Sequence, residues 1–145
     1  MSLPRKPLPA GPHHLLPTTI RRIRREMQPV IEQMLRRDEV VLVTAMGMVG
    51  NHPWLQALGA VRGRAWLAAT NQRLLAVWLS RTSLTPDGYE EWEVDRLAFS
   101  PWRSGVFPGV EMSVDGVVAT SLRFQLAKMA DGVQLIAALA GARSG

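Results

Sequence analysis

Two apolar segments of strand length, residues 64–70 and 73–79, are separated only by Asn71 and Gln72. A connection this short leaves room for little besides a tight turn between antiparallel strands, and asparagine tolerates the positive φ angles found in such turns. The sequence therefore predicts a β-hairpin at this point. Because further apolar segments bounded by turn residues occur along the chain, it also predicts a mainly antiparallel β fold.

Further strands are indicated on both sides of this hairpin. Residues 39–46 are rich in valine and predict the first strand, which is followed by a glycine-rich connection over residues 47–63. A Pro-Asp-Gly turn at residues 86–88 precedes residues 89–95, where apolar and polar side chains alternate as in a half-exposed strand. The alternation changes phase after this segment, which predicts a bulge near Arg96.

The last hairpin has two candidate registers. Its strands span residues 110–114 and 118–124 around an Asp-Gly pair. A two-residue turn would pair Val114 with Val117, whereas a three-residue loop with a glycine bulge would pair Val114 with Val118. We expect the second register because it places more of the apolar side chains on one face.

Helical spacing occurs at both ends of the chain. Residues 18–37 form a basic amphipathic helix, in which Pro29 predicts a kink or a division into two short helices. Residues 126–140 predict a C-terminal helix that ends at Gly141. Gly132 lowers the stability of that helix by about 1 kcal/mol relative to alanine, which packing must offset. The inward-facing residues of the C-terminal helix are expected to be Met129, Val133, Ile136 or Leu135, and Leu139 or Ala140.

These segments together predict a mainly β chain with a single folded domain. The expected architecture is an antiparallel β-sandwich or open barrel of six to seven strands, capped by the C-terminal α-helix. Residues 1–17 contain five prolines and predict a flexible arm. Residues 18–37 are assigned to the basic helix and residues 38–145 to the folded domain.

The chain resembles the bacterial pleckstrin-homology (PH) domains and the related GRAM modules over residues 37–141. Residues 37–41 (Arg-Asp-Glu-Val-Val) resemble the acidic opening of the family's first strand, and residues 92–97 resemble its segment of apolar, x, Asp, x, Ile/Leu. The most specific likeness is the hairpin sequence Thr-Asn-Gln-Arg-Leu at residues 70–74. The resemblance implies a PH-like scaffold without fixed chemistry, whose members bind phosphoinositides, peptides, proteins or each other.

Two details of the sequence bear on this resemblance. Lipid-binding PH domains place Lys/Arg clusters in the loop after the first strand, where this chain offers only Arg62 and Arg64. Specific recognition of inositol phosphates is therefore not expected. Arg73 of the hairpin motif is expected to lie along a sheet edge and to pair with an acid such as Asp95.

Residues that could support catalysis are scarce. The chain contains no cysteine, which excludes disulfides, thiolate zinc sites and a cysteine nucleophile, and which is compatible with a reducing compartment. His52 is the sole histidine after residue 37, and no serine or acid can be tied to it. Glu91, Glu93 and Asp95 are interpreted as the solvated face of a strand. We expect a cytoplasmic, non-enzymatic protein without cofactor, metal or small-molecule substrate, with peripheral contact to the membrane as an alternative.

Two surfaces are candidates for binding. The connection over residues 46–61 is apolar, as surfaces that contact partners often are. Its partner-binding residues are expected to be Met48, Trp54, Leu55 and Leu58. The basic helix could contact an anionic surface, because each basic residue near a charged membrane contributes about 1 kcal/mol. The residues expected to do so are Arg21, Arg22, Arg24 and Arg25.

The charge distribution separates the basic N-terminal region from the rest of the chain. Residues 1–37 hold eight basic and two acidic residues, whereas residues 38–145 hold nine basic and ten acidic residues. Nucleic acid is not an expected partner, because aromatic residues that could stack on bases are missing beside the arginines. The sequence thus predicts a non-catalytic PH-like interaction module that binds another protein or self-associates, through a sheet edge or through the apolar connection. The alternative is peripheral attachment to anionic lipid through the basic helix.

Overall fold

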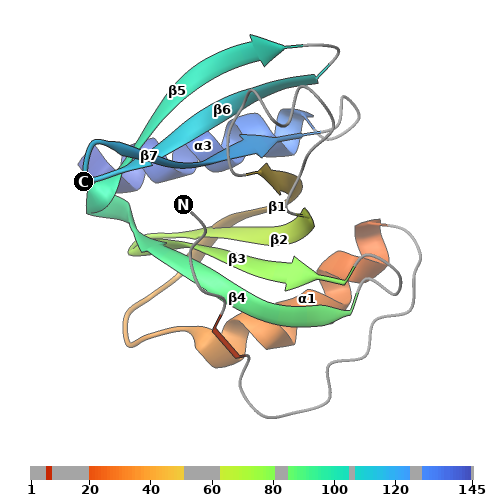
Figure 1. Ribbon diagram of the computed structural model, residues 1–145. Helices are drawn as coiled ribbons and strands as arrows, with labels where there is room; N and C mark the ends of the chain where they lie inside the picture. Colours follow the sequence, from red (N-terminus) through yellow and green to blue (C-terminus); the bar gives the residue numbers. More distant parts are fainter. Residues whose placement is uncertain are drawn as a thin grey trace.

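The computed structural model describes residues 6–7, 20–50, 63–80, 85–104, 107–124 and 129–144. Its strands form one antiparallel sheet in the order β4-β3-β2-β1-β7-β6-β5, with a helix on each side (Figure 1). In chain order the elements are α1 (Ile20–Met34), β1 (Val41–Gly50), β2 (Gly63–Thr70), β3 (Arg73–Leu79), β4 (Pro86–Glu93), the 3-10 turn η1 (Val94–Arg96), β5 (Leu97–Ser104), β6 (Phe107–Val114), β7 (Val117–Arg123) and α3 (Met129–Ser144).

The sheet is divided into two halves that meet at β1. This strand pairs with β2 over most of its length but with β7 only at its last three residues, Met48, Val49 and Gly50. The halves β1–β4 and β5–β7 therefore splay apart, and α3 lies between them against β1, β2 and η1 (Figure 1). The mainly β fold with seven strands and a C-terminal helix, expected from the sequence, is confirmed.

The space enclosed by the two halves and α3 is a continuous apolar core. Phe124 lies at its centre between Gly47 of β1 and Gly132 of α3: a Cβ built on Gly132 would lie 2.5 Å from the ring of Phe124, and one on Gly47 would lie 3.1 Å from it. Both glycines are thus explained by the room that the ring occupies. The fully buried members of this core include Ala45, Val49, Leu67, Leu74, Ala76, Met112, Leu122 and Leu135.

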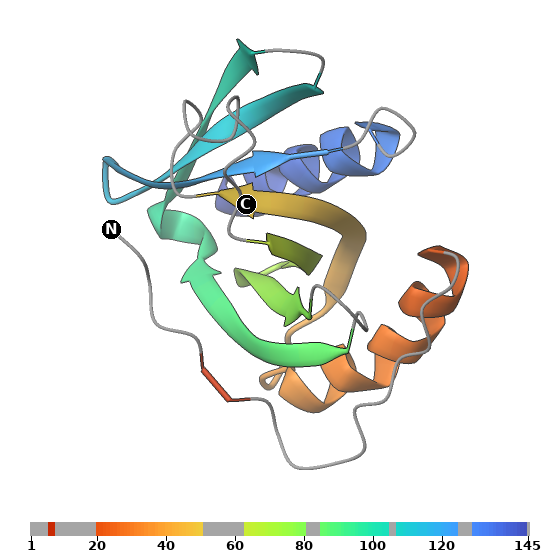
Figure 2. The ribbon, with the colours of Figure 1, turned by 45° about the vertical axis from the view of Figure 1, so that its right-hand side comes forward.

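A second apolar core lies on the opposite, outer face of β1–β4, beneath α1 (Figure 2). The apolar stripe of α1 supplies Ile23, Met27, Val30 and Ile31, which pack on Trp66, Ala68, Leu75, Val77 and Leu79 of β2 and β3. Strands β2 and β3 are consequently buried on both faces, which is why their sequences are apolar throughout rather than alternating. The helix is a single element with Pro29 inside it, so of the two alternatives expected at Pro29 the division into two short helices is wrong.

The turns of the two hairpins differ from expectation in their details. Asn71 is not among the residues with positive φ. It instead accepts a hydrogen bond from the main-chain N–H of Val40 at 2.8 Å, and Thr70 shapes the turn by accepting one from the N–H of Arg73 at 2.9 Å. In the last hairpin Val114 pairs with Val117, so the expected three-residue loop is wrong.

The last hairpin nevertheless places Met112, Leu122 and Phe124 together in the apolar core. Asp115 and Gly116 have φ angles of 53° and 82°, as a two-residue turn of type I′ requires. The ladder then shifts by one residue between Met112 and Ser113, so that Met112 pairs with Thr120. This bulge restores the phase in which the apolar residues share one face.

Four other expectations, at β4, η1, β1 and α3, also need correction. The Pro-Asp-Gly turn expected at residues 86–88 is a bulge inside β4, and the phase change near Arg96 is made by η1 rather than by a bulge. Strand β1 continues to Gly50, beyond the expected end at residue 46. Helix α3 continues past Gly141 to Ser144, and Val133 is 64% exposed because Gly132 occupies the inward position.

Candidate functional site

A buried arginine at the start of β3 organises one end of the outer face. The guanidinium of Arg73 donates two hydrogen bonds to the carboxylate of Glu39, from Nε to Oε2 at 2.9 Å and from Nη2 to Oε1 at 3.0 Å. Nη2 also donates to the main-chain oxygen of Met34, the last residue of α1, at 2.6 Å, and Nη1 donates to Glu91 of β4. One side chain therefore joins α1, the connection before β1, and two strands.

The carboxylate of Glu39 is fully satisfied in this position. Its Oε2 accepts a hydrogen bond from the hydroxyl of Thr70 at 2.7 Å, and its Oε1 accepts one from the main-chain N–H of Arg36 at 2.8 Å. Burial acts to raise the pKa of Glu39, but the hydrogen bonds from Arg73, Arg36 and Thr70 outweigh it and hold the pKa below its ordinary value. Glu39 is thus ionised at neutral pH. The expected pairing of Arg73 with Asp95 is wrong.

The acidic residues of β4 continue this ion-pair cluster toward the surface. Besides Arg73, Glu91 contacts Nζ of Lys6 at 2.7 Å, and Glu93 contacts Nη2 of Arg36 at 2.5 Å. Burial acts to raise the pKa of Glu91, but the hydrogen bond from Lys6 and the charges of Arg73 and Lys6 lower it on balance. Both carboxylates are thus ion-paired. The interpretation as a solvated face is wrong for Glu91, whose side chain is 21% exposed, whereas Glu93 is 39% exposed and Asp95 is exposed.

Lys6 forms an extra, one-residue strand on the edge of β4. Its main-chain N–H donates to the oxygen of Tyr89 at 2.7 Å, and the N–H of Tyr89 donates to the oxygen of Lys6 at 2.8 Å. The ammonium group of Lys6 also lies 6.0 Å from the centre of the Tyr89 ring. The short red stretch beside β4 marks this segment (Figure 1). An extended segment therefore adds to the sheet at an outer edge, as in β-strand addition.

The edge of β4 is regular on only one side of Tyr89. Main-chain N–H and C=O groups alternate in direction along a strand, so those of Glu91 and Glu93 point to the same edge as those of Tyr89. On the other side, Gly88 has a φ of 81° and the ladder with β3 shifts, so the edge is interrupted. The stretch that a further strand could follow therefore runs from Tyr89 toward Glu93.

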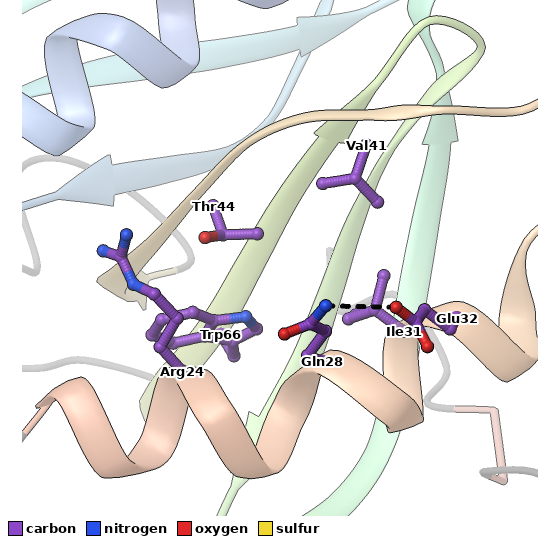
Figure 3. Close-up of a pocket in the computed structure, with 7 residues that line it drawn as sticks. All are labelled: Arg24, Gln28, Ile31, Glu32, Val41, Thr44 and Trp66. Carbon is purple, nitrogen blue, oxygen red and sulfur yellow. Dashed lines mark hydrogen bonds between the residues drawn. The ribbon is translucent and has the colours of Figure 1, made fainter.

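A second candidate surface is a cleft of about 250 Å³ between α1 and β1 (Figure 3). Its α1 side carries Arg24, Gln28 and Glu32, spaced four residues apart along one ridge of the helix. Arg24 lies 5.7 Å from the centre of the Trp66 ring and 3.3 Å from Asp131 of α3, and Gln28 donates to Glu32 at 3.2 Å. These polar side chains are thus engaged with one another or with neighbouring elements.

The residues singled out for binding fall in different places. Met48 is half-buried on β1, whereas Trp54, Leu55 and Leu58 lie outside the described residues. Partner binding through these four residues therefore stays a prediction.

The basic helix is docked on the sheet rather than free. Of the four arginines predicted to bind an anionic surface, Arg25 is exposed, and the side chain of Arg21 lies outside the described part of the chain. Arg22 lies 3.7 Å from Glu26, and Arg24 contacts Asp131. Since the apolar stripe of α1 is buried in the second core, the helix cannot insert that stripe into a bilayer while it stays docked. Binding of anionic lipid by these arginines stays a prediction.

Comparison with known proteins identifies the fold. No family model and no curated protein matches the sequence. Among solved structures, the chain is similar to the hSac2 domain from human phosphoinositide phosphatase Sac2, with 14% identity and a TM-score of 0.56 over 84% of this chain and 80% of that domain. The fold is PH-like. The Vps36 N-terminal PH domain is also similar, with 19% identity and a TM-score of 0.48 over 77% of this chain and 86% of that domain.

The likeness to the hSac2 domain shows the fold of the PH-like chain and leaves its ligand open. Within the described part of the chain, no three His, Cys, Asp or Glu residues are grouped so that they could hold a metal ion. Of the helices that the structure describes, none is both long and apolar enough to span a membrane. The relation to bacterial PH domains and GRAM modules stays a prediction.

The sequence indicated a sheet edge as a candidate binding surface but did not indicate which edge. Lys6 and Glu91 are 85 residues apart, and no short-range pattern links them. The flexible arm predicted over residues 1–17 is described only at residues 6 and 7, where Lys6 is extended and paired. The one available signal was the Thr-Asn-x-Arg hairpin motif, because an arginine in a run of apolar strand residues needs a buried acid nearby.

Proposed function

We propose that the chain is a non-catalytic PH-like interaction module that binds another protein by pairing an extended segment of that protein with the edge of β4. The observation that carries this proposal is the pair of main-chain hydrogen bonds between Lys6 and Tyr89. Main-chain pairing supplies affinity for any extended segment, and neighbouring side chains supply the selectivity. The PH-like fold is compatible with this function but does not by itself decide it.

The proposal predicts that binding depends on the main-chain N–H of Tyr89. Peptides would be selected from a displayed random library on the purified full chain, and the affinity of each would be measured by fluorescence anisotropy. Tyr89→Pro removes the N–H that points to the edge and spares the ladder with β3, so we expect it to weaken binding at least about tenfold. Tyr89→Ala keeps that N–H and is expected to retain most of the affinity.

Thermal unfolding followed by circular dichroism would verify that both variants fold. Selected peptides that bind the folded Tyr89→Pro variant as tightly as the unchanged chain would place binding elsewhere and refute strand addition at β4. Self-association through residues 46–61 is the other form of protein binding that the sequence predicts. Selected peptides that inhibit dimerisation, and that do not compete with Lys6 for the edge of β4, would support it instead.

A further inference from the structure

From the contacts of Glu91 we infer that the edge of β4 selects a partner strand that carries a basic residue, and that Lys6 holds this site as an intramolecular competitor. The inference rests on the proposed strand addition and names its partner class: an extended polypeptide segment with lysine or arginine opposite Tyr89. It also assigns a role to the N-terminal segment, whose single described pairing covers the same edge.

The carboxylate of Glu91 is fixed by Arg73 at one oxygen and presents its other oxygen to a cation at the edge of β4. Its Oε2 accepts from Nη1 of Arg73, and Arg73 is itself fixed by two hydrogen bonds to the buried Glu39. Its Oε1 faces the edge and contacts Nζ of Lys6 at 2.7 Å. The only other cation near this carboxylate among the described contacts is Arg36, 4.0 Å from Oε2 and closer to Glu93. A negative, oriented acceptor at a strand edge favours a basic residue in the added strand.

The chain's own segment is poorly suited to extend its pairing with β4. An antiparallel ladder through Lys6 and Tyr89 would next require an N–H from position 4 opposite Glu91, and position 4 is proline, which has none. In the other direction the bulge at Gly88 interrupts the edge. A partner strand with a basic residue at the same place and a non-proline residue two positions earlier could form further main-chain hydrogen bonds. Such a strand would displace Lys6.

The test uses a defined probe and the full chain. The probe is the fluorescent, acetylated hexapeptide Ser-Val-Thr-Lys-Val-Thr. Its control has norleucine in place of lysine, which keeps the four-carbon chain and removes the charged ammonium group. Lys6→Pro removes the resident cation and the N–H that donates to Tyr89, and it lies outside both apolar cores. Lys6→Arg keeps both features and serves as the matched control.

We expect the lysine probe to bind the Lys6→Pro chain about tenfold more tightly than the unchanged chain. This is the effect of a resident segment that occupies the edge about nine-tenths of the time. The Lys6→Arg chain should bind like the unchanged one, and the norleucine probe should bind Lys6→Pro about tenfold more weakly than the lysine probe. Equal affinities of the lysine probe for the unchanged and Lys6→Pro chains would overturn the competition. Equal affinities of the two probes would overturn the selection of a basic residue.

These outcomes are separate from the failure of the proposed function. One pair of results would support strand addition at β4 and refute this inference. The selected peptides would lose affinity in Tyr89→Pro, while the affinity of the probes would change neither in Lys6→Pro nor on loss of the lysine charge. Selected peptides that bind Tyr89→Pro as tightly as the unchanged chain, together with a lysine probe that binds none of the chains, would refute both the proposed function and this inference.

Discussion

Replacing Arg73 by methionine is expected to lower the free energy of unfolding by about 3–5 kcal/mol, the usual effect of removing one partner from a buried ion pair. The side chain of Arg73 is 5% exposed, and that of Glu39 is completely buried. The variant leaves the charge of Glu39 buried with only the hydroxyl of Thr70 and the N–H of Arg36 as donors. It also removes the donor to the last carbonyl of α1. Urea unfolding would measure the loss.

Two further variants make this result interpretable. Arg96→Met removes an ion pair of similar geometry with Asp115, but both side chains are more than half exposed. The expected change there is much smaller, because water screens an exposed ion pair. The double variant Arg73→Met/Glu39→Leu removes both buried charges and is expected to recover part of the stability lost in the single variant. An Arg73→Met chain no less stable than Arg96→Met would show that the ion-pair cluster does not hold α1 and β4 to the sheet.

Gly132→Ala is expected to destabilise the chain by about 1–3 kcal/mol, although alanine is the better helix former. A Cβ on Gly132 would lie 2.5 Å from the ring of Phe124, which is itself enclosed against Gly47 on its other side. Because the contact would be far shorter than a van der Waals distance, the ring or α3 must shift from its packed position. Chemical denaturation of the purified variant would give the change in free energy of unfolding.

The same helix offers a matched control for this prediction. Gly141 is exposed within α3, and a Cβ there would meet no atom within 4 Å. Gly141→Ala should therefore gain roughly 0.5–1 kcal/mol from helix propensity alone. The two substitutions are chemically identical and are expected to have opposite signs. A Gly132→Ala variant that is as stabilised as Gly141→Ala would disprove the close contact between α3 and Phe124.

The parts of the fold that local patterns determine were predicted correctly. Apolar segments and turn residues indicated every strand except β5, and the helical stripe of α1 was visible as spacing in the sequence. Strand register was harder to predict, because it depends on bulges that local patterns do not reveal. One bulge lies between Met112 and Ser113, and the other lies at Gly88. The inward face of α3 was misplaced at Val133 because Gly132 contributes no side chain and is recognised only from the ring that packs on it.

The candidate site could be predicted only in part, since it depends on contacts between distant segments. The unbroken apolar sequences of β2 and β3 indicate burial on both faces, and the stripe of α1 indicates what covers the outer one. Arg73 in such a strand implies a buried acid, but the sequence does not say that the acids are Glu39 and Glu91. The pairing of Lys6 with Tyr89 joins a proline-rich segment to an edge strand and has no local signature.

The proposed function and the further inference share one premise, that an extended segment lies on the edge of β4. Amide hydrogen exchange at Tyr89 measures that contact directly. The N–H of Tyr89 points away from β3 and is hydrogen-bonded only to the oxygen of Lys6 among the described contacts. In the unchanged chain we expect this amide to be protected, and in Lys6→Pro we expect its protection to fall while that of Trp92, within the β3 ladder, is unchanged. A Tyr89 amide that exchanges as fast as an unstructured one in the unchanged chain would contradict the account.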